Sequence, residues 1–323
     1  IKSLKITLTG KHEKNNRTEV QYMYEGQPRT LGGSFTMTTI ALSSALKSSK
    51  AEDNYYSATF EKFLRYRNTI KNRLEGNYTR TTYPAGGFMA DNQSLVGKPY
   101  DPSVAAVDAN SSDVLIPAFI AAYTGKNADK VSLSAFPSLL SMLPNWAINY
   151  DGLANIPFIK ERFRTLRLSH GYTCYYQVNS YTSFASWVQT DDDLGYIRDV
   201  LSGKPVPSSP YSIGSVTITE MFNPLFGAEG TLNNNMSIGM NMAAYQIVEA
   251  LQKDFNILYS YRINEFNRII GLTSRNAKNF NNDLKIEINL SYKTDQALIR
   301  KIEENFTQAT SGVTTVTLKC AAD

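Results

Sequence analysis

The sequence predicts an all-β protein, an antiparallel transmembrane β-barrel sector that carries a partly helical, Pro-rich insertion. Three observations support this prediction. Several segments alternate between apolar and polar residues, which is the period of a β-strand. Tyrosine is abundant, with 20 residues, while charged residues make up only 19% of the 323-residue chain against about 25% in typical soluble domains. The clearest strand, 283–293, is long enough to cross a bilayer at a tilt, which takes about 9–11 residues.

Residues 1–83 are predicted to form barrel strands. Leu4, Ile6 and Leu8 alternate with polar residues from the first positions onward, so we expect the chain to begin inside a strand. Gly and Pro residues then separate further short alternating runs. The expected strands lie at about 2–9, 18–24, 34–42, 54–64 and 70–82.

Residues 84–162 are predicted to form a folded insertion, which could be a lid, a plug or a packed loop. Seven prolines interrupt its alternation between 84 and 157. Ser112 and Asp113 are suited to cap a short helix, and Gly125 is suited to end it. The apolar face of this helix is a candidate gate or docking surface for a partner, with simple packing as the alternative. Its members are Ile116, Phe119, Ile120 and Tyr123.

Residues 163–323 are again predicted to form barrel strands. A first pair is expected at 163–178 and 181–190, separated by Asn179 and Ser180, and a plain loop at 202–210. A meander of antiparallel hairpins is expected from about 212 to the end, with turns at 233–235 and 279–283.

The strand 284–293 carries the most regular alternation of the chain. One parity is polar and is predicted to face the lumen; its members are Lys285, Glu287, Asn289 and Lys293. The other parity is predicted to face lipid; its members are Leu284, Ile286, Ile288, Leu290 and Tyr292.

Alternation alone does not say which face of a strand meets water. Tyrosines near the ends of strand-like runs favour the membrane interpretation, because barrels carry aromatic girdles at both interfaces. Such tyrosines occur at 22, 24, 55, 56, 259, 261 and 292. Two alternatives remain open: a secreted β-sandwich for adhesion or carbohydrate binding, and a nutrient-transporter barrel with a plug.

The residues predict no enzyme, no catalytic group and no cofactor. Two His and two Cys are too few for a disulfide framework or a His-rich metal site. His170 and Cys174 share a strand face but are about 13 Å apart. The acidic run 191–195 lacks the ligand spacing of an EF-hand and is interpreted as a solvated turn. The net charge of +4 is too dispersed to indicate nucleic-acid binding.

Several segments resemble the C-terminal part of the SprA/Sov family. The similarity is strongest from about 110 to 304 and looser over the first eighty residues. The matching segments are 111–126, 130–133, 143–146, 149–153, 156–160, 216–220, 222–227, 299–303 and 310–312.

This resemblance implies an outer-membrane translocon of the type IX secretion system, a giant single-chain β-barrel that passes folded cargo proteins. The implied partners are the rest of the same large barrel chain, a PorV-type barrel, a periplasmic plug, accessory subunits, secreted cargo and outer-membrane lipid. The implied location is the outer membrane. Because the family continues beyond the point that matches Asp323, we expect at least one final hairpin to be missing from this chain.

Overall fold

The computed structural model describes residues 3–20, 30–42, 50–191, 193–247, 250–264, 283–301 and 306–322. These residues form mostly antiparallel sheet, as predicted. The chain divides into two compact units. The sheet unit contains 1–9, 145–173 and 219–323, and the helical unit contains 10–144 and 174–218. The two units do not follow the predicted boundaries at 83 and 162, because 84–144 belongs with 10–83 and 145–162 belongs with the strands of the sheet unit.

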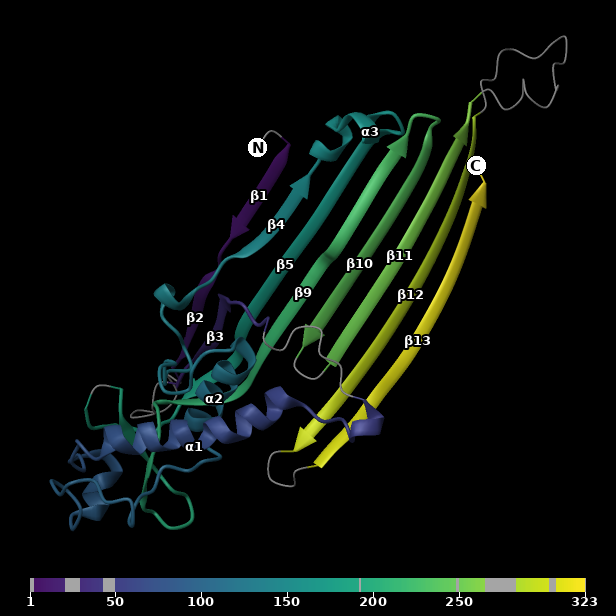
Figure 1. Cartoon of the computed structure of the whole chain (residues 1–323). Coiled ribbons are helices and arrows are strands. Elements are labelled where there is room, and N and C mark those ends of the chain that lie inside the picture. The colour runs from purple at the N-terminus through teal and green to yellow at the C-terminus, as the bar shows by residue number, and fades with distance from the viewer. Residues whose placement is uncertain are drawn as a thin grey trace, which may run out of the picture. The chain divides into compact units, whose positions relative to one another are not determined.

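The sheet unit is built from long neighbouring strands (Figure 1). The strand order is β1-β4-β5-β9-β10-β11-β12-β13, and the last five strands are the predicted meander. Two short helices also belong to this unit, η4 (Gly152–Asn155) and α3 (Pro157–Lys160). The strands are β1 (Leu4–Thr9), β4 (Asn145–Tyr150), part of β5 (Phe163–Ser183), part of β9 (Tyr211–Leu232), β10 (Met236–Ile247), β11 (Ala250–Ile263), β12 (Leu284–Lys301) and β13 (Phe306–Ala322).

The helical unit combines two longer helices with short strands. Helix α1 (Ala58–Tyr78) packs against α2 (Ser112–Thr124). β2 (His12–Glu19) pairs with β3 (Thr30–Thr38), which in turn pairs with the end of β5. A small sheet consists of β6 (Val188–Gln189), β7 (Gly195–Arg198) and β8 (Pro205–Pro207). The short helices are η1 (Ala51–Asp53), η2 (Gly87–Asn92) and η3 (Leu139–Ser141). Among all described residues, no helix is both long enough and apolar enough to cross a membrane.

The predicted barrel strands at 54–64 and 70–82 are wrong, because helix α1 occupies most of this region. Ser57 begins the helix by accepting a hydrogen bond from the Phe60 amide at 3.2 Å. The buried residues of the helix recur three, four or seven positions apart, which is the spacing of one helical face. These residues include Phe60, Phe63, Ile70, Leu74 and Tyr78. The weak alternation of this segment concealed that period.

The predicted strand pair at 163–178 and 181–190 is also wrong, because β5 runs unbroken from Phe163 to Ser183. The register against β3 shifts at the polar pair that was interpreted as a turn: Phe35 lies opposite Val178, but Gly33 lies opposite Tyr181. Asn179 and Ser180 therefore mark a β-bulge, which inserts a residue without reversing the chain.

Three further expectations are corrected or limited by the structure. The loop predicted at 202–210 contains β8, whose prolines lie on the edge of the small sheet, where a missing amide is tolerated. A strand was expected at 18–24, but β2 ends at Glu19. Residues 21–24 lie outside the described residues. The turn expected at 279–282 also lies outside them. β4 was not predicted, although Trp146, Ile148 and Tyr150 alternate along it.

Helix α2 confirms the predicted helix of the insertion. It ends at Gly125, which adopts the left-handed conformation with φ 72°, the conformation for which glycine is preferred at a helix end. At the other end the capping position is Ser111, one residue earlier than expected, and its side chain bonds to the Asp108 carbonyl at 2.8 Å. The prediction therefore located the helix but misassigned its first residue.

Gly171 permits a close approach of β5 to β9, and we expect Gly171→Ala to destabilise the sheet unit. An added Cβ would lie 2.5 Å from the Asn223 carbonyl oxygen, so one of the two backbones would have to move. Gly239→Ala is the matched control, because its Cβ would meet its nearest neighbour at an ordinary 3.6 Å. Thermal unfolding should show a lower midpoint for the first variant only, and equal midpoints would contradict the close approach.

Candidate functional site

The two faces of β12 differ in chemistry as predicted. Ile288, Leu290 and Tyr292 have exposed fractions of 40%, 40% and 46%. On the opposite face, Lys285 forms an ion pair with Glu287, and Lys293 lies 3.6 Å from Asp295. Asn289 lies on this face between the two pairs. The four predicted lumen residues therefore share one polar face, while their assignment to a lumen stays a prediction.

The apolar face continues from β12 into its neighbours, because residues paired across an antiparallel sheet share a face. We call the resulting ladders the apolar rows. The first row is Phe226, Met242, Phe255, Tyr292 and Val316. The second row is Ala228, Met240, Ile257, Leu290 and Leu318. The third row is Gly230, Ile238, Tyr259, Ile288 and Cys320.

The rows that alternate with these ladders belong to the other face and are mostly polar. One reads Gly227, Asn241, Asn256, Ser291 and Thr317, and another reads Thr231, Ser237, Ser260, Glu287 and Ala321. Leu258 is an apolar exception that lies opposite Asn289. The segregation of side chains seen in β12 thus extends over five strands.

The apolar rows have a limited height along the strands. The apolar parity of β12 runs from Leu284 to Tyr292, eight residue steps, close to the roughly 9–11 residues with which a tilted strand crosses a bilayer. In the row beyond Tyr292 the same face carries Lys253, Thr294 and Thr314 on β11–β13, while β9 and β10 continue with Phe222 and Ala244. On β11–β13 the apolar surface therefore ends at the row that contains three aromatic rings.

Tyrosines of the predicted girdle fall in different places. Two of them, Tyr259 and Tyr292, belong to apolar rows. Tyr261 pairs with Ile286, the next pair along the same face. Tyr55 and Tyr56 precede helix α1 and do not end a strand, which corrects that part of the prediction. Tyr22 and Tyr24 lie outside the described residues.

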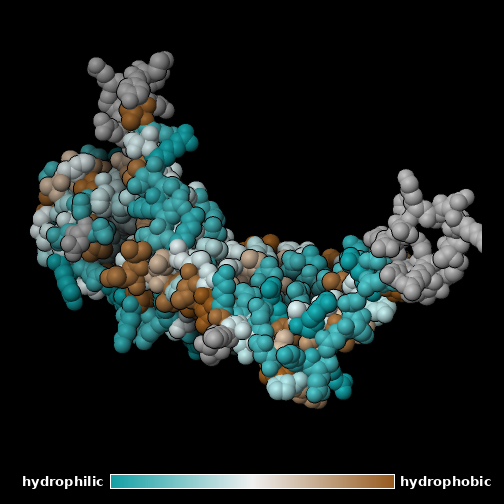
Figure 2. Space-filling model, turned by 90° about the horizontal axis from the view of Figure 1, so that it is seen from above, coloured by the Kyte–Doolittle hydropathy of each residue, from teal (hydrophilic) through white to brown (hydrophobic). Residues whose placement is uncertain are grey.

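The described residues of the sheet unit form no layer over the apolar rows. Its described residues outside the strands form only loops and the short helices η4 and α3. Val316 and Leu318 each have an exposed fraction of 65%. Hydrophobic (brown) residues reach the surface next to hydrophilic (teal) ones in Figure 2. A sheet normally buries at least one face against another layer, and the described part of the unit supplies no such layer for these rows.

The four candidate gate residues on α2 do not behave alike. Ile116, Ile120 and Tyr123 are buried, whereas Phe119 is partly exposed and its ring centroid lies 4.7 Å from that of Tyr123. Burial also extends to Val114, Ala118, Ala121 and Ala122, so α2 is enclosed on most sides. The expected single apolar face is therefore wrong, and the burial favours packing. A gating or docking role stays a prediction.

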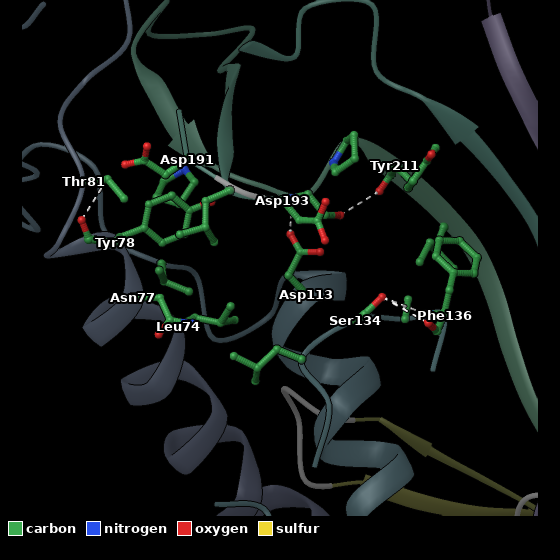
Figure 3. A pocket seen from close by; sticks show the side chains of 18 of the residues that line it. Leu74, Asn77, Tyr78, Thr81, Asp113, Ser134, Phe136, Asp191, Asp193 and Tyr211 are labelled. Carbon is green, nitrogen blue, oxygen red and sulfur yellow. Dashed lines mark hydrogen bonds between the residues drawn. The ribbon is translucent and has the colours of Figure 1, made fainter. Parts of the chain in front are cut away.

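A cavity of about 660 Å³ lies in the helical unit, within the size range of small-molecule sites. Asp113 points into it from the first turn of α2, between a side that carries Tyr78 and a side that carries Tyr211 (Figure 3). Asp191 and Asp193 also line it and are exposed, which agrees with the solvated turn predicted for them. We call this space the Asp113 cavity.

Asp113 is the most buried carboxyl group of the cavity. Its Oδ2 accepts a hydrogen bond from the Ser209 amide at 2.8 Å. Burial raises the pKa of Asp113 above its usual range, and the bond from Ser209 offsets part of that rise. Nearby, the Tyr78 hydroxyl donates to the Gly195 carbonyl at 2.8 Å, and burial raises the pKa of Tyr78 as well.

This shift predicts a pH-dependent effect of Asp113→Asn. The folded protein holds the Asp113 proton to a higher pH than the unfolded chain does, whose pKa is about 3.9. Stability therefore falls as pH rises from the unfolded pKa through the folded pKa. Asn cannot ionise, so we expect the variant to raise the thermal midpoint at pH 7 and to change it little at pH 3. A rise of the same size at both pH values would contradict the assignment.

No described His, Cys, Asp or Glu residues form a group of three that could hold a metal ion. His170 Nδ1 lies 2.7 Å from the Leu225 carbonyl oxygen, which gives this histidine a structural partner in the sheet unit. No family model matches the chain, and no curated protein matches it.

The residues of the Asp113 cavity were not recognised as a site from the sequence. They come from positions as distant as Lys14 and Ile213, and none belongs to a spaced motif. Two signals were available: Asp113, an acidic residue beside the apolar run of α2, and the acidic run 191–195, from which Asp191 and Asp193 line the cavity. Sequence reasoning connects neither of them with the other.

Proposed function

We propose that this chain forms a sector of the wall of an outer-membrane translocon for type IX secretion. In this proposal the strands cross the outer membrane, the apolar rows contact lipid, and the polar face lines a water-filled passage for folded cargo proteins. The chain performs no chemistry of its own and acts as a conduit.

The observation that carries the proposal is the uncovered set of apolar rows across β9–β13. Their alternation with polar rows, their height and their aromatic border are the features of a lipid-facing barrel surface. A secreted β-sandwich is less favoured, since its apolar face would pack against a second sheet, and the sheet unit supplies none among its described residues.

The open edges of the sheet support a larger barrel. β1 has only β4 as a neighbour, and β13 has only β12 among the described strands. An open edge in lipid leaves amide and carbonyl groups without partners. We therefore propose that further strands of the same large barrel chain close the wall, as the resemblance to the SprA/Sov family implies.

The resemblance also favours a translocon over a nutrient transporter. It implies that a PorV-type barrel, a periplasmic plug and accessory subunits assemble with this chain. Barrel diameter grows roughly linearly with strand number, so a wall of many strands suits folded cargo. A hole of that size requires a plug to prevent leakage.

Depletion of the protein in the cells that produce it tests the proposal. We expect secreted cargo to accumulate in folded form in the periplasm, and the protein itself to leave membranes only with detergent. A nutrient transporter would instead leave cargo secretion unchanged and reduce uptake of one solute. Release of the protein by a salt or alkaline wash would support the β-sandwich and overturn the proposal.

A further inference from the structure

Three aromatic rings of the helical unit surround the ammonium group of Lys14. Its Nζ lies 4.2 Å from the ring centroid of Phe136, 5.2 Å from that of Tyr211 and 5.6 Å from that of Tyr181. All three distances are within the range of cation–π attraction, about 6 Å. We call this arrangement the Lys14 cage.

The rings of the cage support one another. The Phe136 centroid lies 4.8 Å from that of Tyr181 and 5.5 Å from that of Tyr211, and the two tyrosine centroids are 5.1 Å apart. Tyr181 is buried, and its hydroxyl donates to the Asn15 carbonyl at 3.2 Å. The cage is thus fixed by β5, β9 and the segment that carries Phe136.

The cage opens onto the Asp113 cavity, because Lys14, Phe136 and Tyr211 all line it. The same lining carries three carboxyl groups, those of Asp191, Asp193 and Asp113, and Asp113 lies between the Tyr78 side and the Tyr211 side in Figure 3. Aromatic faces and carboxylates are the two kinds of group that attract a cation. One cavity therefore offers both.

Lys14 is suited to leave the cage when another cation arrives. Its side chain is exposed on β2, and within the described residues it takes part in no ion pair. Its attraction to the rings is weakened by solvent, since exposed cation–π contacts are weaker than buried ones. The cage therefore holds Lys14 weakly.

We propose that the Asp113 cavity binds the cationic side chain of a peptide, with lysine as the model case, and that Lys14 is an internal competitor for the cage. The entering ammonium group would take the place of Lys14 against Phe136 and Tyr211, and the carboxyl groups of the cavity would attract it over a longer distance. The volume of about 660 Å³ leaves room for residues that flank the cationic one. This proposal rests on the helical unit and goes beyond the wall function, so either can fail without the other.

Titration calorimetry with the full chain in detergent tests this proposal. The probe is a capped pentapeptide with one central lysine among glycines, and the matched probe carries norleucine instead, which has no charge. We expect the lysine peptide to bind and the norleucine peptide to bind at least tenfold more weakly. Equal affinity for the two peptides would overturn the proposal. It would also be overturned if neither peptide bound to the natural chain or to Lys14→Met.

Lys14→Met separates recognition from damage to the fold, because it is expected to improve binding. Removing the competitor should tighten the lysine peptide by about two- to thirtyfold, the equivalent of one cation–π contact. Phe136→Leu and Asp113→Asn should each weaken it. Lys62→Met is the control, because Lys62 lies over the single ring of Tyr66, 5.3 Å away, and outside the cavity. If Lys14→Met and Phe136→Leu, tested as separate variants, both left the affinity for the lysine peptide unchanged, the cage would not be the binding site.

Discussion

Ile288→Arg is expected to reduce the amount of folded protein in the outer membrane far more than Asn289→Arg. Ile288 lies in the third apolar row between Tyr259 and Cys320, while Asn289 lies on the polar face between Leu258 and Lys319. An arginine on the lipid face costs roughly 2–4 kcal/mol near the bilayer midplane. On a wet face the same side chain is solvated and costs little.

The two substitutions are neighbours on one strand, so they share the local backbone and differ mainly in the face that they occupy. The fraction of folded protein can be measured by protease resistance in isolated outer membranes. Similar resistance in both variants would contradict the assignment of faces. A loss confined to Asn289→Arg would reverse that assignment.

Ile120→Ala is expected to destabilise the helical unit by about 2–5 kcal/mol, the range for truncating a buried Ile or Leu. Ile120 has an exposed fraction of only 4% and lies on a helix that is enclosed on most sides. The loss combines the transfer free energy of the removed carbons with the cavity that remains.

Hydrogen exchange across 112–124 should become faster in Ile120→Ala and should change less in Phe119→Ala, because Phe119 is only partly buried. Leu140→Ala is a surface control in the same unit, since Leu140 has an exposed fraction of 97%. An equal effect of the Phe119 and Ile120 variants would restore the interpretation of α2 as a helix with one shared apolar face.

The meander from 212 onward was predictable because β10, β11 and β12 carry long alternating patterns. The pairing that aligns Phe255 with Tyr292, and Tyr292 with Val316, was not predictable in detail, since alternation fixes the parity of a strand but not its partner register. The apolar rows therefore became visible only once the strands were paired.

Helix α1 was missed because the weak alternation of its residues suggested strands. The helical spacing of Phe60, Phe63 and Ile70 was hidden by that alternation. Asn179 and Ser180 were misinterpreted for a different reason, because the same polar residue types suit both turns and bulges. In both cases the tertiary partners of the segment decided the outcome.

The Lys14 cage and the Asp113 cavity were beyond sequence reasoning. Their residues include members of β2, β5, β8, β9, α1 and α2, together with 133–136, 191, 193 and 194, and no spacing rule connects such distant positions. Only the identity of the residue types, aromatic rings and carboxylates, could be known beforehand.

The alternation of lipid and water contact along β12 tests the wall function most directly. Single nitroxide labels at 285–293, introduced as cysteines after Cys174→Ser and Cys320→Ser, can be probed in native-like bilayers with oxygen, which concentrates in lipid, and with a water-soluble nickel complex. We predict high oxygen access at 286, 288, 290 and 292, and high nickel access at 285, 287, 289 and 293. Nickel access at every position, or access that does not alternate, would contradict a strand that separates lipid from a lumen.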